Sequence, residues 1–168
     1  MSSRHFLPLI VATTLALSAI PIGAAEHAHA LDAHGAAAPI LDNGQKWKTD
    51  APLRQGMASI KAALQPQRHA IHANKLKPAA YQALAKQTRA QIAFIVDNCK
   101  LAPAADAQLH RIIADLGAAA DAMAGKDKAS SQHQSQHQGA LQLVHALETY
   151  GEFFDHPGWA APATKQQH

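Results

Sequence analysis

The chain has 168 residues, of which 48% are hydrophobic and 16% charged, with a formal net charge of +3. This length suits one domain around a single core. The lysines and arginines are scattered, so the chain lacks the basic patch of a nucleic-acid or anionic-membrane binder. Cys99 is the only cysteine, which excludes an internal disulfide. We expect Cys99 to be a half-buried hydrophobe at a helix end, with an intermolecular disulfide or a soft metal ligand as alternatives.

Residues 1–25 have the three-part pattern of a secretory signal peptide. Arg4 provides a short basic start, an apolar run extends from Phe6 to Ile22, and small residues continue to Ala25. We therefore expect export to the periplasm with cleavage after Ala25, and we exclude this segment from the fold. No later segment is apolar enough to cross a membrane.

The next segment, residues 26–49, is rich in histidine and lacks a sustained hydrophobic period. It is expected to be a largely irregular leader, with Trp47 as its anchor to the body. A helical period then begins, which predicts a first helix over residues 50–73, capped by Thr49 or Asp50 and broken near Pro66. Its expected buried residues are Leu53, Met57, Ile60, Leu64 and Ile71.

Three more helices follow from the same period. A second is expected from Lys77 or Pro78 to about Cys99, with Tyr81, Leu84, Ala85, Thr88, Ile92, Ile95 and Val96 buried. A third is expected over residues 103–124, with Leu109, Ile112, Ile113, Leu116, Ala120 and Met123 buried and Gly125 as its stop. A fourth is expected over residues 139–155, with Leu143, Val144, Leu147, Tyr150 and Phe154 on one face. Strand signals are absent.

Four amphipathic helices with short joints predict an all-α fold, an antiparallel up-down-up-down four-helix bundle over residues 50–159, followed by a flexible tail over 160–168. In this topology the joint over residues 69–77 and the polar linker over 125–139 lie at one end. The leader, the CKLAP turn and the FFDHPGW segment lie at the other end.

Histidine is unusually frequent, with twelve residues, and imidazole is the commonest metal ligand. The leader holds His27, His29 and His34, which could surround Cu(II), Zn(II) or Ni(II) with Asp32 adding an oxygen. Cleavage after Ala24 would instead give a mature start of Ala-Glu-His, which suits a square-planar Cu(II) or Ni(II) site. Cleavage after Ala25 fits the small-residue rule better.

Two histidine pairs are predicted to meet at one end of the bundle. His69 and His72 are three residues apart, and His133 and His137 are four apart. The two histidines of each pair therefore lie about one helical turn from each other. Together they offer four imidazoles to one site. The alternative is that SSQHQSQHQG is a solvated linker, and that His69 and His72 are exposed helix positions.

The layout also resembles the cytochrome b562 family, exported bundles that hold a b-type haem between a methionine and a histidine. The resemblance would make Met57 the methionine ligand and His145 or His156 the histidine. Periodicity, however, places Met57 in the core and turns His145 toward solvent, and His156 directly precedes Pro157. There is no CxxCH, which excludes covalent haem.

Three stretches, LDNGQKWKTDAPLRQGM, DNCKLAPAADAQLHRIIADL and YGEFFDHPGW, are similar to small proteobacterial exported proteins described as DnrO-like. This resemblance implies export and a helical fold, and it implies no established activity. No Ser/His/Asp or Cys/His arrangement stands out and the carboxylates fall on exposed faces or caps, so we expect no enzymatic activity.

The leading hypothesis is a periplasmic metal-buffering or metal-transfer protein, with copper ahead of zinc and nickel because divalent affinities peak at Cu(II). A non-catalytic protein-interaction module is the second hypothesis, with Phe153 and Trp159 as its surface. A b-type haem carrier is a minor alternative. Titration of the many imidazoles between pH 5 and 7 would also suit a pH sensor.

Overall fold

The computed structural model describes residues 39–125 and 132–160, which belong to one compact unit, residues 33–168. The expected signal peptide, the leader as far as residue 38 and the tail from residue 161 lie outside the described residues. So do residues 126–131 of the expected linker.

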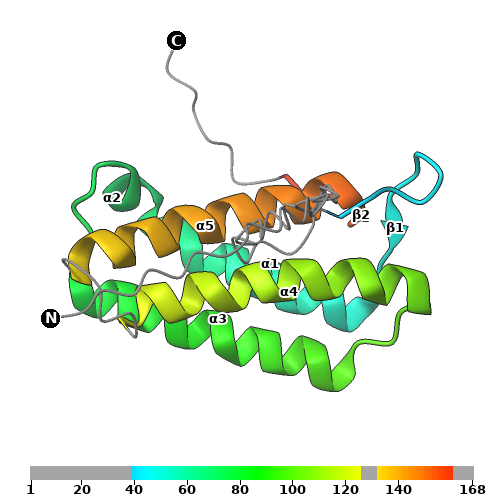
Figure 1. The fold of residues 1–168 in the computed structure, drawn as a ribbon, viewed down its shortest axis with the longest axis horizontal. Coiled ribbons are helices and arrows are strands. Elements are labelled where there is room, and N and C mark those ends of the chain that lie inside the picture. Colours follow the sequence, from blue (N-terminus) through cyan, green and yellow to red (C-terminus); the bar gives the residue numbers. More distant parts are fainter. Residues whose placement is uncertain (1–38, 126–131, 161–168) are drawn as a thin grey trace, which may run out of the picture. The chain divides into compact units, whose positions relative to one another are not determined.

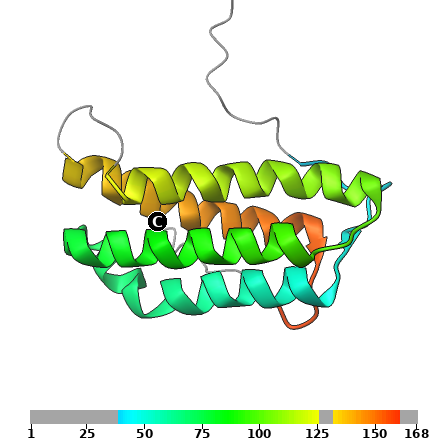
Figure 2. The ribbon, with the colours of Figure 1, turned by 90° about the horizontal axis from the view of Figure 1, so that it is seen from below.

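Four long helices run side by side and form the expected all-α bundle (Figures 1 and 2). They are α1 (Ala51–Leu64), α3 (Pro78–Asn98), α4 (Pro103–Met123) and α5 (Gln132–Phe153). Between α1 and α3 lie a 3-10 turn, η1 (Gln65–Gln67), and the short helix α2 (Arg68–His72). Pro66 therefore produces the predicted break in the first helix, because its ring cannot sit in a regular helix interior. Within the described residues, no helix combines the length and the apolar character that a membrane span requires.

The start of α1 is joined to the turn between α3 and α4 by one carboxylate. Asp50 is the N-cap of α1, and its Oδ1 accepts a hydrogen bond from the Leu53 amide at 2.9 Å. Its Oδ2 accepts another from the Lys100 amide at 2.6 Å. Burial opposes ionisation of Asp50, but these hydrogen bonds outweigh it, and the pKa of Asp50 is lowered.

Cys99 occupies the C-cap of α3 and is half-buried, as expected. Its Sγ lies 3.5 Å from Asp50 Oδ1, to which the thiol donates. Burial, followed by the negative charge of Asp50, raises the pKa of Cys99 to about 12. The side chain is therefore a thiol at neutral pH and a poor nucleophile.

A two-residue parallel strand pair closes the same end of the bundle, where no strand was expected. Strands β1 (Trp47–Lys48) and β2 (Phe154–Asp155) pair with Trp47 opposite Phe154. The hydroxyl of Thr49 also donates to the Asp155 carbonyl at 2.6 Å. Trp47 packs against the core, as predicted for the anchor of the leader. Segments this short give no alternating pattern, so the sequence could not reveal them.

Helix α5 begins two turns earlier than the sequence predicted. The polar run over residues 132–138 was expected to be linker, yet it is helical. Gln136 is fully buried there, and its Nε2 donates to the Met123 carbonyl at the end of α4 at 3.1 Å. Gln has a good intrinsic helix propensity. The run lacks an apolar stripe, so apolar periodicity could not indicate that it is helical.

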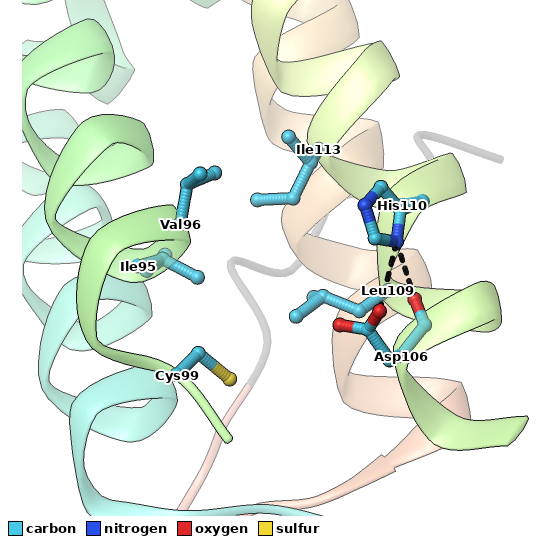
Figure 3. A pocket seen from close by; sticks show the side chains of 7 residues that line it. All are labelled: Ile95, Val96, Cys99, Asp106, Leu109, His110 and Ile113. Atoms are coloured by element: carbon cyan, nitrogen blue, oxygen red, sulfur yellow. Dashed lines mark hydrogen bonds and ion pairs between the residues drawn. The ribbon is translucent and has the colours of Figure 1, made fainter. Parts of the chain in front are cut away.

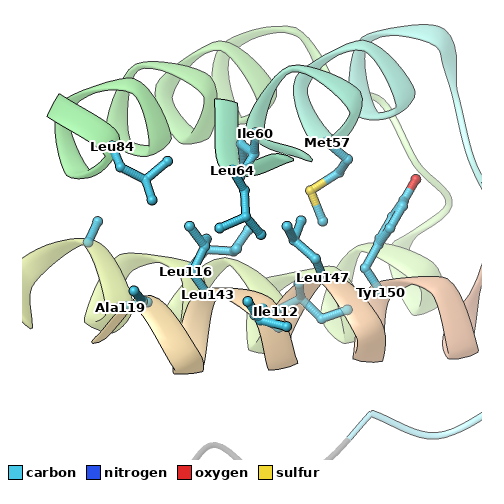
Figure 4. Close-up of a cluster of buried hydrophobic side chains, with 14 of the residues drawn as sticks. Met57, Ile60, Leu64, Leu84, Ile112, Leu116, Ala119, Leu143, Leu147 and Tyr150 are labelled. Atoms are coloured by element: carbon cyan, nitrogen blue, oxygen red, sulfur yellow. The ribbon is translucent and has the colours of Figure 1, made fainter. Parts of the chain in front are cut away.

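Most of the residues predicted to be buried do lie in the hydrophobic core, and Figure 4 shows several of them. Met57 is fully buried among them. Ile92 and Ile113, also predicted to be buried, are only half-buried at the edge of the core, and Val96 is 64% exposed. Its neighbour Ile95 is buried instead, since successive helical residues point about 100° apart and only one of this pair can face the interior.

Replacing Asp50 by Ala should lower the free energy of unfolding by roughly 1–2 kcal/mol, because the cap of α1 is lost and the Lys100 amide loses its acceptor. Urea unfolding of the two proteins measures the difference. The control is Asp155→Ala, which removes only an exposed ion pair to Lys48 and should change stability very little. Equal effects of the two substitutions would contradict the role of Asp50.

Gly139→Ala should destabilise the protein by about 1–3 kcal/mol, because α4 and α5 touch at this position. A Cβ there would lie 2.8 Å from the Ala119 carbonyl oxygen and 2.9 Å from the Met123 nitrogen, so backbone would have to move. Gly117→Ala is the matched control: its Cβ would meet nothing within 4 Å, and the better helix former should stabilise by about 0.5–1 kcal/mol. Thermal unfolding should therefore shift in opposite directions for the two variants.

Candidate functional site

The end of the bundle that carries α2 is joined to α5 through a histidine. His137 is half-buried, and its Nε2 lies 3.0 Å from the carbonyl oxygen of Ile71. A carbonyl can only accept a hydrogen bond, so Nε2 must carry the proton. In the neutral imidazole, Nδ1 then holds the free lone pair. The contact fixes both the tautomer and the plane of the ring.

His133 lies one turn earlier on α5 and is exposed. Its ring meets the Tyr81 ring edge-on, with 6.0 Å between centroids. Tyr81 is fully buried, and burial raises the pKa of its hydroxyl. Within the described part of the chain, that hydroxyl oxygen has no hydrogen-bond partner. His133 is therefore a helix residue with one aromatic neighbour, not a linker residue.

The second predicted pair belongs to α2. His69 and His72 are both exposed. The His137 ring contacts the peptide that joins Ile71 to His72, so the two pairs do lie at the same end of the bundle, as the topology predicted. They do not form a ready-made centre: across residues 39–125 and 132–160, no three His, Cys, Asp or Glu side chains are grouped to hold a metal ion. His27, His29 and His34 lie outside the described residues.

The residues suggested by the haem resemblance differ in burial and in partners. Met57 is in the core, whereas His145 is exposed on α5, as the periodicity predicted. His156 follows β2 and is half-buried. Its Nδ1 shares a hydrogen bond of 3.0 Å with the hydroxyl of Tyr150. That nitrogen is therefore already engaged within the protein.

The aromatic residues of FFDHPGW pack onto the bundle. Phe153 is half-buried and contacts the core, whereas the interaction module would need it on the surface. Trp159 meets the Tyr150 ring edge-on at 4.9 Å between centroids, and the Lys61 ammonium lies 4.6 Å from the Trp159 ring centroid. Both candidate interaction residues thus already have partners within the chain.

The electrostatic surroundings of His156 favour its neutral form. Burial lowers the pKa of His156, and the positive charges of Arg54 and Lys61 lower it further. Both cations belong to α1, which adjoins this corner of the bundle. Protonation of His156 would place a third positive charge beside them.

Two of these contacts had no sequence signal. The hydrogen bond from His137 to Ile71 depends on α5 beginning before residue 139. The pairing of His156 with Tyr150 depends on the chain leaving the helix at Phe153 and continuing as β2. Comparison of the chain with protein-family models, with curated proteins and with solved structures gave no match.

Acidification should weaken the fold partly through His156. Its folded pKa lies below the unfolded value of about 6.5, so the unfolded chain takes up the proton first. The contribution of His156 to stability is complete above pH 6.5 and is lost as the pH falls through the folded pKa. His156→Asn keeps a hydrogen-bonding amide near Tyr150 but cannot titrate.

The measurement is the free energy of urea unfolding between pH 7.5 and 5. The decline on acidification should be shallower in His156→Asn than in the natural protein. His72→Asn removes an exposed imidazole and should leave the decline unchanged. Parallel curves for the natural protein and His156→Asn would contradict this assignment.

Proposed function

We propose that this protein is a periplasmic transition-metal carrier, which buffers or hands over an ion without using it in catalysis. The observation that carries the proposal is the hydrogen bond from His137 Nε2 to the Ile71 carbonyl. Histidine ligands commonly donate their second ring nitrogen to a carbonyl or carboxylate, which fixes the tautomer and orients the ring. His137 is held in this way, and the lone pair of its Nδ1 is available to coordinate an ion.

His133 supplies a second imidazole one turn away on the same helix. The exposed His69 and His72 stand on the neighbouring α2. Because these side chains are not grouped around one point, the ion would have to draw them together or take further ligands from His27, His29 and His34. An incomplete site of this kind suits exchange of an ion between proteins better than permanent retention.

Copper is the preferred ion, followed by zinc and nickel, because imidazole-rich sites follow an affinity order that peaks at Cu(II). Cys99 is not part of the proposed centre, since its thiol has a raised pKa and it lies at the opposite end of the bundle. The proposed export signal and the proposed kinship with DnrO-like exported proteins would both suit a periplasmic role. No observation favours the interaction module, because Phe153 and Trp159 already pack within the chain.

The test uses the full-length protein, exported from its own signal and purified without chelator or tag. His133→Gln/His137→Gln removes the two α5 ligands, and the glutamine at position 137 can still donate to Ile71. Native mass spectrometry should find copper retained by the natural protein. In competition with a chromophoric chelator, the variant should bind Cu(II) at least roughly tenfold more weakly.

The matched control, His110→Gln/His145→Gln, removes two exposed imidazoles from other positions and should keep the natural affinity. A third variant, His27→Ala/His29→Ala/His34→Ala, measures the contribution of the leader. Equal affinities in all four proteins would contradict the metal assignment at these residues. Mass spectrometry of the same sample also identifies the mature N-terminus and so tests cleavage after Ala25.

A further inference from the structure

A cavity of about 270 Å³ lies between α3 and α4, close to the turn that joins them. Figure 3 shows its lining, which α3 supplies through Ile95, Val96 and Cys99. Helix α4 supplies Asp106, Leu109, His110 and Ile113, which share one face because they recur every three or four residues. The cavity is separate from the histidine end of the bundle, where His137 contacts Ile71.

The larger part of the lining is hydrocarbon. Ile95 and Leu109 are buried and form the inner wall, while Ile113 is half-buried. Val96 is 64% exposed, an unusual position for a large aliphatic side chain in this protein. A ligand that covered Val96 would remove this apolar surface from water, which stabilises the bound state by the hydrophobic effect.

The polar part of the lining is acidic. Asp106 Oδ2 lies 3.4 Å from His110 Nδ1, and the same nitrogen lies 2.9 Å from the Asp106 carbonyl oxygen. Both oxygens are acceptors, so Nδ1 carries the proton. Within the described residues, Asp106 Oδ1 makes no hydrogen bond. One carboxylate oxygen is therefore available to a ligand.

The pKa of the Cys99 thiol is raised first by burial, then by the charge of Asp50, and further by the charge of Asp106. The negative charge of Asp106 therefore acts within the cavity. Asp50 adds a second negative charge behind Cys99. The cavity thus combines apolar walls with an acidic end. An anionic ligand would be repelled, and a neutral hydrocarbon would leave Asp106 Oδ1 without a hydrogen-bond partner beside it.

We propose that the α3–α4 cavity binds a small aralkyl or branched alkyl monoamine, whose ammonium group pairs with Asp106 and whose hydrocarbon body contacts Ile95, Leu109 and Val96. The volume supports a ligand on the order of ten heavy atoms, because a dry cavity of about 150 Å³ already accepts benzene. Phenethylamine has this size and charge and serves as the probe. The proposal is independent of metal binding.

The experiment is a titration of the whole mature protein with phenethylamine, in which binding is monitored by the backbone amide chemical shifts. Saturable shifts are expected for residues 95–99 and 106–113. Phenethyl alcohol, which keeps the ring without the charge, should bind at least roughly tenfold more weakly, as should 3-phenylpropionate. Saturation by the carboxylate as readily as by the amine would overturn the proposal.

Asp106→Asn should weaken phenethylamine binding at least roughly tenfold and should leave the weak binding of the alcohol unchanged. Asp97→Asn is the matched control, because it makes the same charge change at an exposed α3 position outside the cavity. Val96→Ser should weaken the binding of both the amine and the alcohol by a few-fold. Because Val96 is exposed, this substitution should not unfold the protein. Equal losses in Asp106→Asn and Asp97→Asn, or shifts scattered over the bundle, would overturn the assignment.

Discussion

The carboxylate of Asp50 holds together two parts of the chain that meet at one end of the bundle. It caps α1 through the Leu53 amide, and it binds the Lys100 amide in the turn after α3. The thiol of Cys99 approaches the same carboxylate. The start of the first helix and the joint between the second and third long helices are therefore positioned by one side chain. The cavity between α3 and α4 opens beside that joint, so its acidic end also depends on Asp50.

Apolar periodicity was sufficient to predict the three helices whose buried faces are aliphatic. Leu53, Ile60 and Leu64 lie in the core as expected, and Pro66 breaks the first helix where its ring requires. The prediction failed where polar residues take core positions. Gln136 is fully buried because its amide satisfies the free carbonyl of Met123, and no hydrophobicity pattern can anticipate that pairing.

The candidate site was predictable in location but not in geometry. Topology placed the pairs on α2 and α5 at one end, since short joints force consecutive helices to be antiparallel neighbours. The direction of each imidazole depends on individual contacts, such as that of His137 with Ile71, which no hydrophobic pattern in the sequence indicates. The α3–α4 cavity was also missed, because Val96 was assigned to the core and not to the edge of an opening.

The parallel pairing of β1 with β2 has a mechanical consequence. The chain enters the bundle through Trp47 and leaves it through Phe154, and these residues face each other across the strand pair. A pull on the two flanking segments would load the pair in shear, across its backbone hydrogen bonds and the Lys48–Asp155 contact, once the contacts of Ile40 with Gln108 and of Trp159 with Tyr150 had been lost. The strand pair thus joins the two flanking segments at the end of the bundle opposite the histidine-bearing end, so stretching those segments would not load the histidine-bearing end directly.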